Sequence, residues 1–319
     1  MKKFKASAPG KIILFGEHAV VYQRPAIAIP IHQVQATVTV QERTNDGQQG
    51  ILLDAPQIKL QSMANTLPLD HPMEILFRLL ANAIEVETYP DVTLSIHSSI
   101  PLASGMGSGA AISVATIRAL LGYLDKTIPI EKINALAYQI EKKYHGTPSG
   151  IDNTVITYEQ PIFFIRGTPF LKLKSVQEFT LVIADSGIPS TTLEVVADVR
   201  KGWQEEPQVF EALFDQIGSI VLDARQIIEN GPITSLGPLM NSNQSALRKL
   251  GVSSPRLDYL IDAALFAGAL GAKLSGGGRG GNIIALVEKN KADDVSLALQ
   301  SAGARSTIIT TETPDNPNT

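Results

Sequence analysis

The strongest constraint on this chain is a glycine-rich segment at residues 100–112, with the sequence Ile-Pro-Leu-Ala-Ser-Gly-Met-Gly-Ser-Gly-Ala-Ala-Ile. An alternating run that contains Val92, Leu94 and Ile96 precedes it, and a long helix-like run follows. Glycines at this density let the backbone approach a bulky ligand and present consecutive N–H groups. The following helix directs its positive end to the same place. The segment therefore predicts an anion site, and specifically a site for the phosphates of a nucleotide.

Other interpretations of the segment compete with a nucleotide site. A flexible turn between a strand and a helix needs no ligand at all. A P-loop requires Gly-Lys-Ser/Thr at the helix start, and no lysine lies between Pro101 and Ile117. A dinucleotide fingerprint matches Gly105 to Ala110, with Asp125 at about the right distance. That motif needs a second strand before the acid, and residues 110–124 read as one uninterrupted helix.

Composition narrows the function class. The chain has 319 residues, enough for one large or two medium domains, and its 44% hydrophobic and 18% charged content is typical of a globular protein. A net charge of -4 provides no general basic surface, so no nucleic-acid partner is predicted. Because there is no cysteine, disulfides and thiolate metal sites are excluded. The five histidines show no helical ligand pairing, so they do not predict a zinc site.

Neither a membrane span nor a signal peptide is predicted. No apolar run reaches the roughly 18 residues of a span. The basic start at residues 1–5 resembles that of a signal peptide, but Lys11, Glu17 and His18 interrupt its apolar part. We therefore expect a cytoplasmic protein without a membrane partner.

Strands and helices alternate in both halves of the chain, which predicts an α+β fold. We expect two domains, residues 1–174 and 175–319. Helices are expected at 73–86, 109–124, 129–144, 256–270 and 292–301, and a mostly helical stretch from Leu193 to about Leu250. Strands are expected at 12–15, 36–40, 92–96, 179–184, 282–287 and 307–310, a hairpin at 163–165 and 171–173, and a second glycine loop at 271–281.

Three segments place charged or hydroxyl residues among glycine and proline: residues 8–22, the first glycine loop, and residues 141–153. Phosphoryl transfer needs a phosphate cradle, a cation, a metal held by oxygen ligands, and a base or orienting group for the attacking hydroxyl. The loop at 104–109 suits the cradle and Lys11 the cation. Glu141 and Ser108 offer oxygen ligands to Mg²⁺. Asp152 suits the base.

Each of these residues also has a purely structural interpretation. Lys11 can be a solvated loop lysine. Glu141, which precedes two lysines, can belong to a surface charge cluster. Ser108 and Asp152 can cap helices or turns, and His18 and His145 can be structural histidines. Local sequence alone leaves these alternatives open.

The three segments, together with Lys-Leu-Ser-Gly-Gly-Gly-Arg-Gly-Gly at 273–281, resemble the motifs of the GHMP kinase family. The segments at 9–22 (Pro-Gly-Lys-Ile-Ile-Leu-Phe-Gly-Glu-His-Ala-Val-Val-Tyr) and 145–153 (His-Gly-Thr-Pro-Ser-Gly-Ile-Asp-Asn) are most similar to members that phosphorylate mevalonate. The resemblance spans nearly the whole chain. It implies an N-terminal ribosomal-protein-S5-like domain, which binds the nucleotide, and a C-terminal ferredoxin-like domain.

The resemblance also assigns roles to residues. It implies Asp152 as the catalytic aspartate with Lys11 as its cationic partner, and Glu141 as a Mg²⁺ ligand, which Ser108 would assist. By the same resemblance, Glu17 and His18 fall where substrate and nucleotide contacts are made, and both are expected to bind the substrate. The residues expected to wrap the ATP phosphates are Ser104, Gly105, Met106, Gly107, Ser108 and Gly109.

The implied activity is ATP-dependent phosphorylation of mevalonate in isoprenoid precursor synthesis, with Mg²⁺ as cofactor and a homodimer as an open alternative to a monomer. A sibling kinase for another small alcohol or for phosphomevalonate, and a non-catalytic nucleotide-binding regulator, are the alternative hypotheses. This chain departs from the family pattern at several positions. Gly109 replaces a serine, Arg279 a glycine, Asn282 a small residue and Gln23 a glycine.

Overall fold

The computed structural model describes residues 1–43, 47, 49–101, 104–145, 148–190 and 192–314. Its contacts divide the chain into two compact units. The first unit contains Met1–Lys11, Pro30–Pro101 and Gly107–Glu159, and the second contains Ile12–Ile29, Leu102–Met106 and Gln160–Thr319. The chain passes from one unit to the other several times, so no single cut separates them. The expected domain boundary between residues 174 and 175 stays a prediction.

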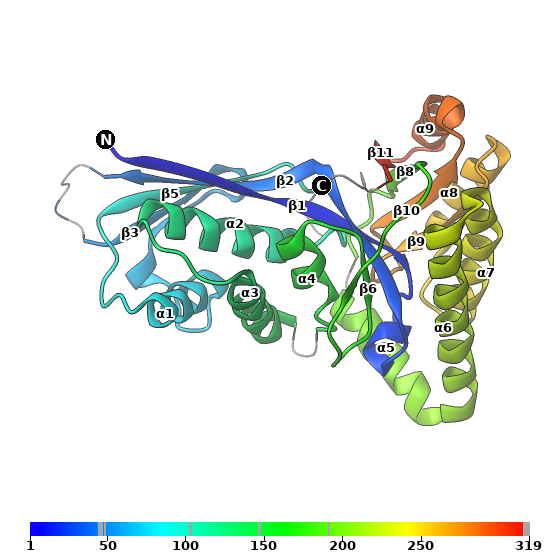
Figure 1. Cartoon of the computed structure of the whole chain (residues 1–319), viewed down its shortest axis with the longest axis horizontal. Coiled ribbons are helices and arrows are strands. Elements are labelled where there is room, and N and C mark those ends of the chain that lie inside the picture. Colours follow the sequence, from blue (N-terminus) through cyan, green and yellow to red (C-terminus); the bar gives the residue numbers. More distant parts are fainter. Residues whose placement is uncertain (44–46, 48, 102–103, 146–147, 191, 315–319) are drawn as a thin grey trace. The chain divides into compact units, whose positions relative to one another are not determined.

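The first unit combines strands with four helices (Figure 1). Its strands follow the order β4-β3-β5-β2, with β3 and β5 parallel and β1 paired to β2. Burial along β5 alternates, with Val92, Leu94 and Ile96 inside, as expected for a half-buried strand. The elements are β1 (Lys3–Phe15), β2 (Ala26–Glu42), β3 (Ile51–Ala55), β4 (Leu60–Met63), β5 (Val92–Ser98), α1 (Pro72–Ile84), α2 (Ser108–Tyr123), α3 (Ile130–His145) and α4 (Ile151–Tyr158). The end of β1, from Ile12, and the start of β2, up to Ile29, belong to the second unit.

The second unit contains an antiparallel four-stranded sheet in the order β11-β8-β10-β9. Numbered along the chain, this is the order 4-1-3-2 of a ferredoxin-like sheet, as the resemblance implied. Helices α7, α8 and α9 pack against its strands. The elements are β6 (Ile162–Phe164), β7 (Leu171–Lys172), β8 (Phe179–Asp185), α5 (Thr192–Glu205), α6 (Pro207–Asn230), α7 (Leu236–Lys249), α8 (Pro255–Phe266), β9 (Gly271–Ser275), β10 (Asn282–Val287), α9 (Ala292–Ser301) and β11 (Ser306–Glu312).

The predicted helices and strands are present, most of them with ends shifted by a few residues, and the stretch from Leu193 is divided into α5, α6 and α7. The strands expected at 12–15 and 36–40 are much longer, since β1 begins at Lys3 and β2 at Ala26, and strands β3 and β4 were not expected. Helix α2 runs without interruption from Ser108 to Tyr123, which excludes the strand that a dinucleotide fingerprint needs. Two further expectations were wrong. Residues 271–275, expected to be loop, form strand β9. Residues 151–158, for which no helix was expected, form α4, which begins directly after its N-terminal cap, Gly150.

Among the described residues, no helix is both long enough and apolar enough to span a bilayer.

Candidate active site

Lys11 and Asp152 form an ion pair in the first unit. The Nζ atom of Lys11 lies 2.9 Å from Oδ1 of Asp152. Lys11 is 2% exposed near the middle of β1, so it is not the solvated loop lysine of the structural interpretation. Asp152 lies in the first turn of α4, whose N-terminal cap is Gly150. The carboxylate of Asp152 therefore lies at the positive end of this helix as well as beside the lysine.

Glu141 adds a second carboxylate to this pair. It lies on α3 and is 8% exposed, whereas its neighbours Lys142 and Lys143 are exposed. The pKa of Glu141 is raised to about 7, mostly by burial and also by the charge of Asp152, while Lys11 opposes both effects. Glu141 therefore does not belong to a surface charge cluster.

The second half of the glycine loop joins the same group. Gly107 caps α2 with a φ of 73° and no side-chain hydrogen bond, and Ser108 is the first residue of the helix. A Cβ atom on Gly107 would lie 2.7 Å from Cδ1 of Ile156 and 3.1 Å from Cγ of Lys11. A Cβ atom on Gly109 would lie 3.2 Å from Oε1 of Glu141. The start of α2 thus lies directly beside both Lys11 and Glu141.

These residues fit a divalent cation. A buried carboxylate whose anionic form is disfavoured by burial and by a second carboxylate is stabilised by a hard cation that takes oxygen ligands. Within the described ranges there is no group of three His, Asp or Glu that could hold a metal by themselves. A cation held here would therefore depend on further oxygen ligands from water or from phosphate.

Glu17 and Lys273 form an ion pair in the second unit, and both side chains are completely buried. Lys273 lies on β9, and its Nζ atom also donates a hydrogen bond of 2.7 Å to the carbonyl of Leu274. The sequence offered no sign of this partner for Glu17. The expected substrate contact of Glu17 stays a prediction.

His18 follows Glu17 in a left-handed backbone conformation, with a φ of 61°. Its Nε2 atom donates to the carbonyl of Gly277 at 3.0 Å. Burial lowers the pKa of His18 to about 4, an effect that the hydrogen bond to Gly277 opposes and the charge of Arg279 strengthens. The imidazole is therefore neutral near pH 7, and its role as a substrate contact stays a prediction. The side chain of the other candidate histidine, His145, lies outside the described part of the structure.

The remaining predicted loop residues, Ser104, Gly105 and Met106, belong to the second unit. There they lie next to the second glycine loop, residues 276–281. A Cβ atom on Gly105 would be 3.9 Å from the carbonyl oxygen of Ser275. The Oγ atom of Ser275 in turn exchanges hydrogen bonds with the backbone of Ile13, at 3.1 and 2.9 Å.

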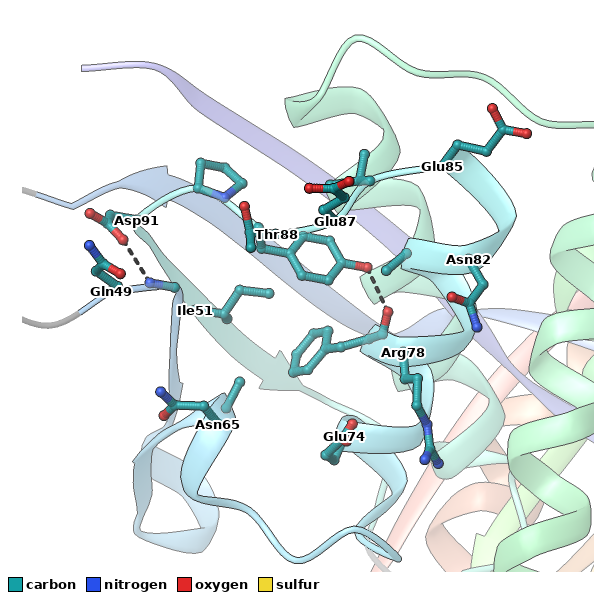
Figure 2. Close-up of a pocket in the computed structure, with 17 residues that line it drawn as sticks. Gln49, Ile51, Asn65, Glu74, Arg78, Asn82, Glu85, Glu87, Thr88 and Asp91 are labelled. Carbon is teal, nitrogen blue, oxygen red and sulfur yellow. Dashed lines mark hydrogen bonds between the residues drawn. The ribbon is translucent and has the colours of Figure 1, made fainter.

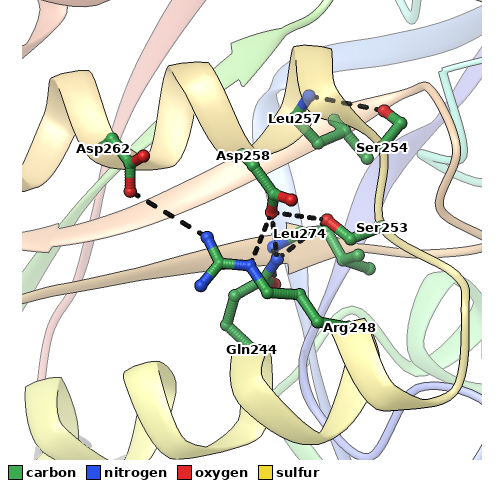
Figure 3. A network of polar contacts seen from close by, with 8 residues as sticks. All are labelled: Gln244, Arg248, Ser253, Ser254, Leu257, Asp258, Asp262 and Leu274. Atoms are coloured by element: carbon green, nitrogen blue, oxygen red, sulfur yellow. Dashed lines mark hydrogen bonds and ion pairs between the residues drawn. The ribbon is translucent and has the colours of Figure 1, made fainter.

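A polar network behind β9 holds this strand in place (Figure 3). Gln244 on α7 accepts a hydrogen bond from the backbone N–H of Leu274 at 3.0 Å. Its amide nitrogen donates to Ser253 and to Asp258. Arg248 pairs with the same aspartate at 2.8 Å. The network therefore connects β9 with α7 and with the start of α8.

A pocket in the first unit lies elsewhere, between α1 and the segment that joins it to β5 (Figure 2). Tyr89 is one of the residues that line this pocket, and its hydroxyl donates a hydrogen bond of 2.8 Å to the carbonyl of Phe77. None of the site residues predicted from the sequence lines it.

The comparisons with known proteins decide the family. The model for the N-terminal domain of GHMP kinases matches residues 74–160, and the model for their C-terminal domain matches residues 224–305. A mevalonate kinase from Pyrococcus abyssi is 36% identical, over 93% of this chain and 92% of its own length. The chain belongs to the GHMP kinase family. The N-terminal match includes the first glycine loop, Glu141 and Asp152, and the C-terminal match includes Lys273 and the second glycine loop.

Two further members of the family resemble this chain along nearly its whole length. A mevalonate kinase from Thermococcus sibiricus is 35% identical and covers 93% of each chain. The crystal structure of the L. major mevalonate kinase in complex with R-mevalonate has a TM-score of 0.83 and 31% identity, with 98% of this chain and 96% of that chain covered. GHMP kinase membership therefore applies to both units.

Proposed function

We propose that this chain transfers the γ-phosphoryl group of ATP to mevalonate, giving phosphomevalonate for isoprenoid precursor synthesis. The observation that carries the proposal is the full-length similarity to mevalonate kinases, one of which was solved with R-mevalonate bound. Because Lys11, Glu141 and Asp152 gather in one place, a catalytic role is better supported than that of a nucleotide-binding regulator, which would not need all three.

The ion pair provides the chemistry at the attacking hydroxyl. The substrate oxygen forms a bond to the γ-phosphorus while the bond between that phosphorus and the leaving ADP oxygen breaks, and the hydroxyl proton passes to Asp152. Positioning and charge stabilisation dominate such reactions. Lys11 offsets the negative charge that accumulates beside the aspartate.

Glu141 and Ser108 would hold Mg²⁺, together with phosphate oxygens and water. Magnesium, when bound, neutralises charge on the phosphate oxygens. The backbone N–H groups at the start of α2, including that of Gly109, point toward an anion placed at this helix end. The residues from Ser104 to Gly109 form the proposed ATP phosphate loop.

An ADP-release assay with the purified protein tests the proposal. ATP and Mg²⁺ are supplied with mevalonate, phosphomevalonate, homoserine or galactose in parallel, and the Asp152→Asn variant is the control. We expect turnover with mevalonate that the variant lacks. Turnover of another alcohol with none of mevalonate would instead favour a sibling kinase. The cytoplasmic location and the homodimer stay predictions.

A further inference from the structure

We propose that Asn282 is a positioning residue that fixes the first half of the phosphate loop, Ser104–Met106, through the carbonyl of Ser104. The inference rests on the proposed function, because it assigns this loop to the ATP phosphates. Asn282 is also one of the positions at which this chain departs from the family motif, where a small residue is usual.

The contact between Asn282 and Ser104 is buried. Asn282 is the first residue of β10, lies between β8 and β9 in the sheet, and is 2% exposed. Its Nδ2 atom donates a hydrogen bond of 2.7 Å to the carbonyl oxygen of Ser104. Ser104 itself is 3% exposed. A buried carbonyl that loses this hydrogen bond cannot form one with bulk water in its place. The bond therefore restrains the backbone of Ser104 strongly.

Two glycines of the second glycine loop, Gly276 and Gly281, pack against the backbone of residues 104–105. Gly281 has a φ of 73°, and a Cβ atom on it would lie 2.8 Å from the carbonyl oxygen of Ser104. A Cβ atom on Gly276 would lie 3.6 Å from the carbonyl oxygen of Gly105. The two stretches therefore lie backbone against backbone, and a side chain on Gly281 would push against Ser104.

The second glycine loop is itself anchored, so it serves as a support. The N–H of Gly281 donates to the carbonyl of Ile188 at 2.8 Å, and its carbonyl accepts from the N–H of Ser186 at 2.9 Å. Because these backbone bonds hold Gly281 in place, the adjacent Asn282 amide is presented to Ser104 from a fixed position. Loss of the amide would remove one restraint on the loop at Ser104 and leave the anchored second loop intact.

The variant Asn282→Ala tests the inference. We expect the KM for ATP to rise about tenfold, the scale of one lost buried hydrogen bond, with a smaller change in kcat and in the KM for mevalonate. Independently of any turnover, amide hydrogen exchange in the peptide that covers residues 104–109 should become faster. This second readout separates the two proposals, since it holds even if mevalonate is not the substrate.

Thr180→Val is the matched control. Thr180 is 2% exposed on β8 and shares a hydrogen bond of 3.1 Å with Thr311 on β11, in the same sheet. The control should lower Tm and leave both the KM for ATP and exchange at 104–109 unchanged. If Asn282→Ala behaves like this control, with a lower Tm alone, the inference is overturned.

A second variant keeps the inference testable if Asn282→Ala does not fold. In Asn282→Asp, the protonated carboxyl can donate to the Ser104 carbonyl, whereas the ionised carboxylate cannot. The KM for ATP of this variant, relative to the wild type, should therefore fall as the pH is lowered. The charged groups near position 282 are Asp185, which lies opposite it on β8, and Arg305, which lies 3.8 Å from Asp185. Both are present in the wild type and in the variant, which is why the two KM values are compared as a ratio. A pH-independent ratio of the two KM values would contradict the proposal.

Discussion

Lys11 and Asp152 form an ion pair in which 3% of the lysine side chain and 33% of the aspartate side chain are exposed. The aspartate can therefore contact a ligand directly, whereas the buried lysine acts through its ion pair with the aspartate. This asymmetry fits a base that receives a proton and a cation that stays in place throughout the reaction.

We expect Asp152→Asn and Lys11→Met to lose kcat by about 10²- to 10⁴-fold, the range typical of general acid–base catalysis. The affinity for ATP, measured by direct titration, should change far less. Lys2→Met is a suitable control, because Lys2 forms an ion pair of 2.6 Å with Asp125 on the surface of the same unit. Near wild-type kcat in both catalytic variants would show that the assignment is wrong.

Glu141→Gln should raise the Mg²⁺ concentration needed for half-maximal kcat sharply, because a charged oxygen ligand is lost. Gly109→Ser should keep most of kcat, although Glu141 must move by a few tenths of an ångström to admit the new Cβ atom. A Mg²⁺ titration of kcat measures both effects. Glu131→Gln, at the exposed start of α3, is the control. An unchanged midpoint for Glu141→Gln would place the metal elsewhere.

Gly107→Ala should reduce both stability and kcat. The left-handed backbone at this position costs a residue with a Cβ about 1–3 kcal/mol, and the new atom would also push against Ile156 and Lys11. Gly167→Ala separates the two effects, because Gly167 has a φ of 87° but no atom within 4 Å of its Cβ position. Thermal unfolding should show a lower Tm in both variants than in the wild type. A fall in kcat is expected for Gly107→Ala alone, and equal kcat values would count against the packing argument.

His18 should make the protein less stable in mild acid. Its pKa is about 4 in the folded protein and 6.5 in an unfolded chain. The unfolded state therefore takes up a proton first, and the free energy of unfolding falls by about 3 kcal/mol as the pH drops from 6.5 to 4. His18→Gln keeps a donor for Gly277 and cannot become charged, so part of this pH dependence should disappear. Urea unfolding at several pH values measures it.

His97→Gln is the control for this measurement, since His97 lies exposed on β5. Its unfolding free energy should follow the wild-type pH dependence. An unaltered slope in His18→Gln as well would mean that another group controls stability between pH 4 and 6.5.

The sequence predicted the elements that carry the site, because their signals are local. Apolar spacing revealed α2 and α3, and the glycines revealed both loops. The burial of Glu141 also had a local signal, since Ala137, one helical turn earlier, belongs to the buried face of α3. Helix α4 was missed because it is short and follows a segment rich in proline and glycine.

The long-range partners could not be predicted from the sequence. Lys273 lies within a motif that the sequence displayed, but nothing local shows that it pairs with Glu17, 256 positions earlier. The same is true of Asn282 and Ser104, 178 positions apart. Such pairs are set by how the strands of the second unit come together, which depends on packing along the whole sheet.

The buried pair of Glu17 and Lys273 also bears on the order in which the chain can fold. As the N-terminal segment leaves the ribosome, its glutamate cannot pair with Lys273 until most of the chain has been synthesised. Closing a loop of this length is entropically costly, and long-range contacts of this kind slow folding. A chain cut before β9 would leave Glu17 without its cation and His18 without its carbonyl acceptor. Glu17 and His18 therefore gain these two contacts only after β9 and the glycine loop that follows it are in place.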